Sequence, residues 1–133
     1  MLSARYSHGT SVVAGKVLVA GGNVGSTETS ATEVFDPATG VWTALSNLVT
    51  ARSEFTVTPL DVGRILIAGG QSGVTRLAVA EIYSASVFSA GASMQAARSA
   101  HSATTLPNGR VLIVGGVGAS GSSINTAELY GTP

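Results

Sequence analysis

An internal repeat limits how this chain can fold more than any other feature of its sequence. Three signals recur in the same order at a period of about 47 residues: a segment ending in arginine, an aliphatic run closed by two glycines, and a glutamate followed by an apolar and an aromatic residue. The recurring residues are Arg5, Arg52 and Arg98; Gly21, Gly22, Gly69, Gly70, Gly115 and Gly116; and Glu33, Glu81 and Glu128. Each repeat should therefore be one structural unit of the same kind.

The composition predicts that this unit is made of strands. The aliphatic runs KVLVAGG, RILIAGG and RVLIVGG are rich in residues that favour strands, and 17 glycines supply turns between them. We expect an all-β protein. Aromatic residues make up only 5 % of the chain, so valine, leucine, isoleucine and alanine should form its interior.

The first repeat predicts four strands, at residues 6–13, 16–22, 31–36 and 41–45. The segments DPATG (36–40) and LPNG (106–109) carry the Pro, Asp, Asn and Gly residues that favour hairpin turns. We expect repeats at about 1–47, 48–93 and 94–133 within a single partial domain. The third repeat stops at ELYGTP, before a fourth strand, so about eleven strands are predicted in total.

The period and the motifs together resemble the kelch repeat. A double glycine after an aliphatic strand, then glutamate and an aromatic residue, then Trp42 in the first repeat, are similar to that motif over residues 1–130. The second repeat departs from the pattern: Phe55 replaces the histidine found at His8 and His101, and Phe88 replaces Trp42. The resemblance implies β-propeller blades of four antiparallel strands each, running outward from a central channel.

Three blades are too few to close a propeller, which usually has four to eight. The open blade faces should therefore be covered. Two hypotheses follow: a homodimer of two such chains forms a six-bladed ring, or the chain is part of a longer propeller.

Charge and cysteine content exclude several classes of function. Seven basic residues balance seven acidic ones and do not form the cluster that a phosphate backbone requires, so we expect no nucleic-acid partner. We expect no membrane partner either, because no apolar stretch approaches the roughly 20 residues of a membrane span and the first residues do not form a secretory signal. A soluble protein is expected, and its location stays unknown.

The candidate catalytic groups do not form a recognisable active site. The galactose oxidase family, which has kelch-type blades, depends on a cysteine-crosslinked tyrosine for its copper site, and this chain contains no cysteine. We therefore interpret Tyr6, Tyr83 and Tyr130 as packing residues. His8 and His101 occupy equivalent positions, but two imidazoles are a weak metal signal, and we expect each to cap its strand entry by a hydrogen bond. We predict no enzyme activity, no metal and no cofactor.

The regular spacing of the charged residues points to structural roles. Six of the seven basic residues occupy repeat positions. We expect the arginines of the first set (Arg5, Arg52 and Arg98) to pair with the repeat glutamates (Glu33, Glu81 and Glu128), within or between blades.

The segments after each double glycine are the best candidates for function, because binding residues concentrate on variable loops held by a rigid scaffold. These segments differ in sequence, which fits either a binding rim or an unconstrained surface. The predicted polar binding face consists of Asn23, Glu28, Gln71, Arg76 and Asn125. The sequence thus predicts a non-enzymatic scaffold or recognition module that binds a protein or a glycan. The alternative is a carbohydrate-binding or enzymatic propeller whose active groups come from further blades or a partner chain.

Overall fold

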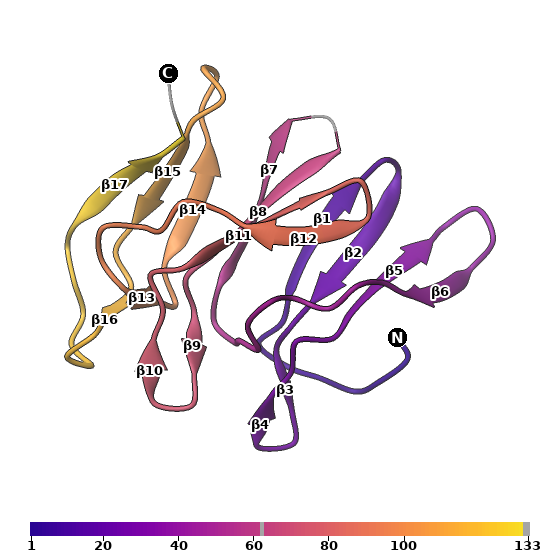
Figure 1. Cartoon of the computed structure of the whole chain (residues 1–133), viewed down its shortest axis with the longest axis horizontal. Helices are drawn as coiled ribbons and strands as arrows, with labels where there is room; N and C mark the ends of the chain where they lie inside the picture. Colours follow the sequence, from indigo (N-terminus) through magenta and orange to yellow (C-terminus); the bar gives the residue numbers. More distant parts are fainter. Residues whose placement is uncertain (62, 132–133) are drawn as a thin grey trace.

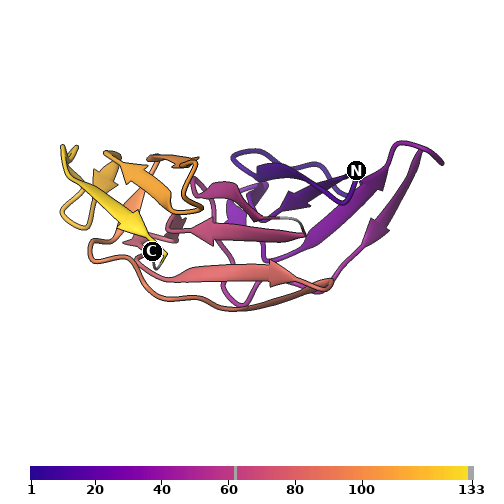
Figure 2. The same ribbon diagram turned by 90° about the horizontal axis from the view of Figure 1, so that it is seen from above.

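The chain folds into β-strands arranged as three sheets side by side. The computed structural model describes residues 1–61 and 63–131, and these residues form seventeen strands and no helix. No helix that could cross a membrane occurs in this part of the chain. The sheets lie in a row, with the first and the third at opposite ends (Figures 1 and 2).

Each large sheet is one blade, with its strands antiparallel and mostly in sequence order. Blade 1 contains β1 (Gly9–Val13), β2 (Lys16–Ala20), β5 (Thr32–Asp36) and β6 (Val41–Ala44). Blade 2 contains β7 (Thr56–Asp61), β8 (Arg64–Ala68), β11 (Ala80–Ser84) and β12 (Val87–Ala90). Blade 3 contains β14 (Ser102–Thr105), β15 (Val111–Val114) and β17 (Ala127–Tyr130). These are the eleven strands expected from the sequence, and the third blade lacks a fourth strand among the described residues.

The remaining strands are two residues long. They are β3 (Asn23–Val24), β4 (Thr27–Glu28), β9 (Gln71–Ser72), β10 (Thr75–Arg76), β13 (Arg98–Ser99) and β16 (Val117–Gly118). The pairs β3–β4 and β9–β10 form hairpins, and β16 is closed by a bridge between Val117 and Ser123. The segments after the double glycines, expected as irregular loops, are therefore mostly short hairpins.

Most of the strand bounds in the first repeat agree with prediction to within two residues. The first strand is the exception, because Tyr6 joins the structure only through an isolated bridge to Asn23, and β1 begins at Gly9. Ser7 between them has a φ of 51°, which interrupts an extended strand. The DPATG turn forms as predicted, with the amide of Gly40 donating to the carbonyl of Asp36 at 2.8 Å.

The hydrophobic core lies between blades and not inside any one of them. Leu18 and Ala20 of β2 cluster with Ile65 and Ile67 of β8. The alternate residues of β8, Leu66 and Ala68, cluster with Val111 and Ile113 of β15. The strand β8 therefore buries both of its faces, one against each neighbouring blade. Three blades accordingly enclose two cores.

The double glycine allows two close approaches at once. A Cβ atom on Gly21 would lie 2.7 Å from the carbonyl oxygen of Arg52 and 2.8 Å from the Phe55 ring, both from the next blade. A Cβ atom on Gly22 would instead lie 2.6 Å from the carbonyl oxygen of Tyr6, in its own blade. The first glycine thus makes room for the neighbouring blade, and the second makes room within its own.

Candidate functional site

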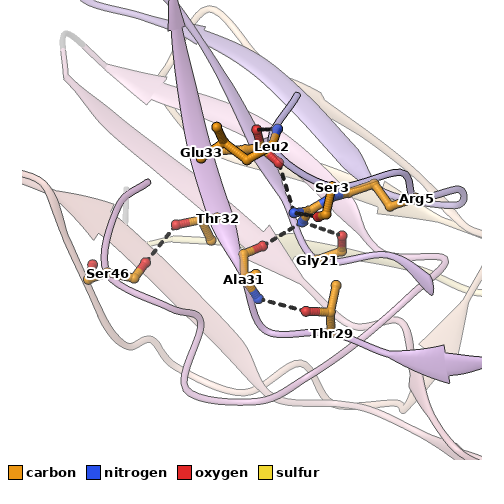
Figure 3. A network of polar contacts seen from close by, with 9 residues as sticks. All are labelled: Leu2, Ser3, Arg5, Gly21, Thr29, Ala31, Thr32, Glu33 and Ser46. Carbon is orange, nitrogen blue, oxygen red and sulfur yellow. Dashed lines mark hydrogen bonds and ion pairs between the residues drawn. The ribbon is translucent and has the colours of Figure 1, made fainter. Parts of the chain in front are cut away.

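A buried arginine–glutamate network occupies each blade where the chain enters it. Arg5 Nη2 lies 2.8 Å from Glu33 Oε1, and both side chains are only 2 % exposed. Arg5 Nη1 donates to the carbonyls of Gly21 and Ala31 at 3.1 and 2.8 Å, and the amide of Leu2 donates to Glu33 Oε2 at 2.6 Å (Figure 3). The guanidinium therefore joins the carboxylate to two strand ends.

The same network recurs in the other two blades. Arg52 Nη2 lies 2.7 Å from Glu81 Oε1, and Arg98 Nη2 lies 3.0 Å from Glu128 Oε1. The expected partners are thus present, and every pair lies within one repeat. The carboxylates also accept hydrogen bonds from the segment that enters the blade, as Glu81 does from the amides of Val49 and Thr50. Burial lowers the pKa of Arg52, while the neighbouring Glu81 opposes that shift.

Each arginine fixes the base of the hairpin that its blade carries. Arg52 Nη1 donates to the carbonyls of Gly69 and Val79, at 2.9 and 3.0 Å, and these residues lie on either side of the β9–β10 hairpin. Arg5 and Arg98 contact the equivalent carbonyls of their own blades. A charge-assisted donor at both sides of a hairpin base fixes the direction in which the hairpin projects.

The three hairpins project from the same end of the blades (Figure 1). We call this region the hairpin end and define it as residues 23–28, 71–76 and 117–125. The opposite end carries the turns of the long hairpins, such as DPATG. The hairpin end is therefore a surface of short, variable segments held by a repeated, buried polar network.

The predicted polar residues lie on the first two hairpins and directly after the third. Asn23 pairs with Glu28 across the first hairpin and Gln71 with Arg76 across the second, while Asn125 lies beyond the third. Asn23 is only 9 % exposed, because its backbone pairs with that of Tyr6. Among the described residues no ion pair joins Glu28 to Arg76, so the structure does not bring these charges into one cluster.

Two apolar residues of the hairpin end were missed by the sequence reasoning. Val74 is 96 % exposed at the turn of the second hairpin, and Val24 is 44 % exposed beside the turn of the first. Each adjoins a turn glycine, Gly73 or Gly25, and that valine–glycine adjacency was the available signal. Exposed valines beside arginine and glutamate give this end both apolar and charged groups for contact.

The histidine position connects neighbouring blades. His101 Nε2 lies 3.1 Å from the Oγ1 atom of Thr56, the first residue of β7, so its hydrogen bond is made at a strand entry of the neighbouring blade. Burial, together with the nearby Arg98, lowers the pKa of His101 to about 4, although Glu128 opposes the shift. Within the residues that the structure describes, no group of three or more His, Asp or Glu side chains could hold a metal ion.

The tyrosines differ in their environments. Tyr83 is buried in the core between blades 1 and 2, and Tyr130 packs against the core between blades 2 and 3, as predicted. Burial raises the pKa of the Tyr130 hydroxyl. The packing interpretation was wrong for Tyr6, whose side chain is 57 % exposed.

A pocket of about 370 Å³ lies between blades 1 and 2, at the end opposite the hairpins. Lys16 borders it, and that ammonium group is held 2.9 Å from Asp36 by an exposed ion pair. The other lining residues are mostly apolar or hydroxylic: Val13, Ala14, Val34, Thr43, Leu45, Tyr83 and Ser86. With a single, already paired cation at its edge, the pocket offers no set of groups for acid–base or nucleophilic chemistry.

Antiparallel sheets of three or four strands, packed face to face and each with the same double glycine and arginine–glutamate pair, define blades of the β-propeller class. Residues 4–49, which cover blade 1, match the family model of the kelch motif. The first repeat therefore carries a kelch motif, a kind of repeat that commonly mediates protein interactions. No curated protein matches the chain.

Proposed function

We propose that this chain is a non-enzymatic recognition module that binds a protein segment at the hairpin end. The supporting observation is that the structure separates constant from variable parts. Three buried arginine–glutamate pairs hold three hairpins at one end, while the hairpin sequences themselves differ. Such a division is typical of binding surfaces built on rigid scaffolds.

The second hairpin provides the main contact residues in this proposal. The Val74 side chain offers apolar area that the chain itself leaves in water, and Arg76 on the same hairpin offers a guanidinium group. Arginine is enriched at protein interfaces, where one apolar or aromatic anchor beside a charged group can dominate the affinity. Glu28 on the first hairpin adds an acidic group, so a partner segment with both an apolar side chain and mixed charge fits this surface.

The proposal is tested by selecting random displayed peptides against the chain and measuring their affinity for variants. Val74→Ser and Arg76→Ala should each weaken the selected peptides at least tenfold, or about 1.4 kcal/mol. Lys16→Ala, at the opposite end, is the matched control and should leave the affinity unchanged. Peptides that bind all three variants equally, or binding on a glycan array without peptide binding, would contradict the proposal.

The open faces of blades 1 and 3 require a separate proposal. We propose that further blades cover them, supplied by a second chain or by the rest of a longer propeller. The supporting observation is that each enclosed core needs two blades, while the outermost blades have one neighbour each.

A further inference from the structure

The two internal junctions between blades share one pattern of contacts. At the first, the Phe55 ring lies against Gly21, and at the second, the His101 ring lies against Gly69. In both, the second glycine donates its amide to the carbonyl of the incoming arginine, Gly22 to Arg52 at 2.8 Å and Gly70 to Arg98 at 2.9 Å. A third junction with the same pattern would place the His8 ring against Gly115 and would let the amide of Gly116 donate to the carbonyl of Arg5.

The two surfaces that such a junction requires belong to blade 3 and blade 1, which lie at opposite ends of the row of blades (Figure 2). On the outer face of blade 3, a Cβ atom on Gly115 would have only one heavy atom of residues 1–61 and 63–131 within 4 Å, the carbonyl oxygen of Ile124 at 3.6 Å. The space that Phe55 and His101 fill at the other two junctions is therefore open beside Gly115. In blade 1, whose outer face has no neighbour, His8 is the residue equivalent to Phe55 and His101 in the repeat.

At both internal junctions, the kind of ring also matches the residue that faces it in the neighbouring blade. Phe55 lies over Gly9, where a Cβ atom would come within 2.8 Å of the ring, whereas His101 makes a hydrogen bond to Thr56 at the equivalent position. A phenyl ring thus lies over glycine, and an imidazole over a hydroxyl residue. The equivalent position in blade 3 is Ser102, which is exposed. Its hydroxyl is the group that an incoming histidine would use.

The apolar residues of the two outer faces complement this polar pattern. Leu18 and Leu66 are buried at the internal junctions, and their equivalent Leu112 lies on the outer face of blade 3, with Leu129 44 % exposed nearby. Because Leu18 faces blade 2, the alternation of side chains places Val17 on the outer face of blade 1. Val12, also in blade 1, is 65 % exposed.

We propose that the outer face of blade 3 binds the outer face of blade 1 of a second copy of this chain. His8 of the second copy lies against Gly115 and bonds to Ser102, and the amide of Gly116 donates to the carbonyl of Arg5 of the second copy. Two such junctions close a ring of six blades, and a third copy would exceed the usual limit of eight. The inference rests on the proposal that further blades cover the open faces, and it is independent of what the hairpin end binds.

Native molar mass, measured by light scattering over a range of concentrations, tests the association. The parent chain should have twice the single-chain mass. Gly115→Ala should weaken the association at least tenfold, because the new methyl group takes the space of the His8 ring. Gly25→Ala is the matched control: Gly25 has a φ of 62° against 66° for Gly115, and has nothing within 4 Å of its added Cβ. Single-chain mass for the parent at all concentrations would overturn the proposal.

Disulfide crosslinking tests the orientation and does not depend on the glycine variant. At the internal junctions the amide of Glu54 donates to the carbonyl of Ser7, and that of Ala100 to Glu54. A head-to-tail ring therefore places Ser7 of one copy beside Ala100 of the other. Because the chain contains no cysteine, Ser7→Cys mixed with Ala100→Cys should yield a covalent dimer, while either variant alone should not. Crosslinking within a single variant, or none in the mixture, would overturn the orientation.

Peptide binding and molar mass report on different surfaces. The selected peptides respond to residues of the hairpin end, whereas the mass responds to the outer faces of blades 1 and 3. A single-chain mass with intact peptide binding would overturn only the ring, and a dimer without peptide binding would overturn only the recognition function.

Discussion

The buried arginines combine three tasks in one side chain. Arg52 is fully buried, neutralises Glu81 and donates to the carbonyls of Gly69 and Val79. Lysine has the same charge but lacks the planar fork that reaches a carboxylate and two carbonyls together. The arginine recurs because geometry as well as charge is required at the base of each hairpin.

Removing this arginine should strongly destabilise the fold. Arg52→Ala leaves Glu81 buried without its counter-charge, and loss of one partner of a buried pair costs about 3–5 kcal/mol. Urea unfolding monitored by circular dichroism would measure the loss. Arg64→Ala is the control, because the Arg64–Asp61 pair is exposed to water and should contribute little. Equal effects of the two substitutions would show that burial of the Arg52 pair does not matter.

His101 should make stability depend on pH. Its pKa is about 4 in the fold and about 6.5 in the unfolded chain, so between these values only the unfolded state binds the proton. The free energy of unfolding should therefore fall as the pH drops from 6.5 to 4, by roughly 3 kcal/mol in total. Urea unfolding across this pH range measures the slope.

The internal junction of blades 1 and 2 supplies the control for that slope. The double variant His101→Phe with Thr56→Gly copies the Phe55–Gly9 pair, which contains no group that titrates here. In this variant, the free energy of unfolding should depend less on pH between 4 and 6.5, because the contribution of His101 is lost. The contributions of the acidic groups should remain. An unchanged slope would assign the pH dependence to other residues.

At the scale of elements, the double glycine should tolerate substitution less well than an ordinary turn glycine. Gly21→Ala introduces a methyl group 2.7 Å from the Arg52 carbonyl oxygen in addition to backbone strain at a φ of 56°. Gly25→Ala has the same kind of strain but open space around it. We expect about 1–2 kcal/mol of destabilisation from the strain alone and a distinctly larger loss for Gly21→Ala. Thermal unfolding of both variants makes the comparison, and equal losses would show that the clash is relieved at no cost.

The sequence predicted the long strands because their aliphatic runs and turn residues recur with a constant spacing. The bounds of β2, β5 and β6 differ from prediction by two residues or fewer. The short hairpins were missed, because strands of two residues such as β3 and β4 are too short to show an alternating pattern. Gly25 and Gly73 were visible as turn residues, but the bridges that close the hairpins are contacts of the folded chain.

The candidate site was predicted in part for a similar reason. The regular spacing of arginine and glutamate pointed to the ion pairs, since both partners recur with the repeat. The exposure of Val74 and the burial of Asn23 depend on which side of a hairpin faces the blade, and spacing does not encode that. The contact of His101 with Thr56 joins two repeats, so comparison of one repeat with another could not show it.

At the scale of the whole molecule, the enclosed cores and the open faces should respond differently to concentration. Leu66→Ala removes a buried side chain between blades 2 and 3 and should cost about 2–5 kcal/mol at any concentration. Leu112→Ala, at the equivalent position on the outer face of blade 3, should cost more as the chain concentration rises, because association buries that leucine. Melting temperatures at two concentrations measure both effects. A cost for Leu112→Ala that is independent of concentration would mean that no second copy covers this face.

Both partners of each buried ion pair come from the same repeat, whereas each apolar core is formed by two neighbouring repeats. This difference limits how the gene can gain or lose length. A deletion or duplication that joins equivalent positions leaves every buried carboxylate with its arginine, whatever the resulting number of blades. A deletion that removes an arginine without its glutamate, or the reverse, leaves a charge buried alone, at a cost comparable to the whole stability of a small domain. The network thus tolerates changes of length by whole blades and opposes those that remove one member of a pair.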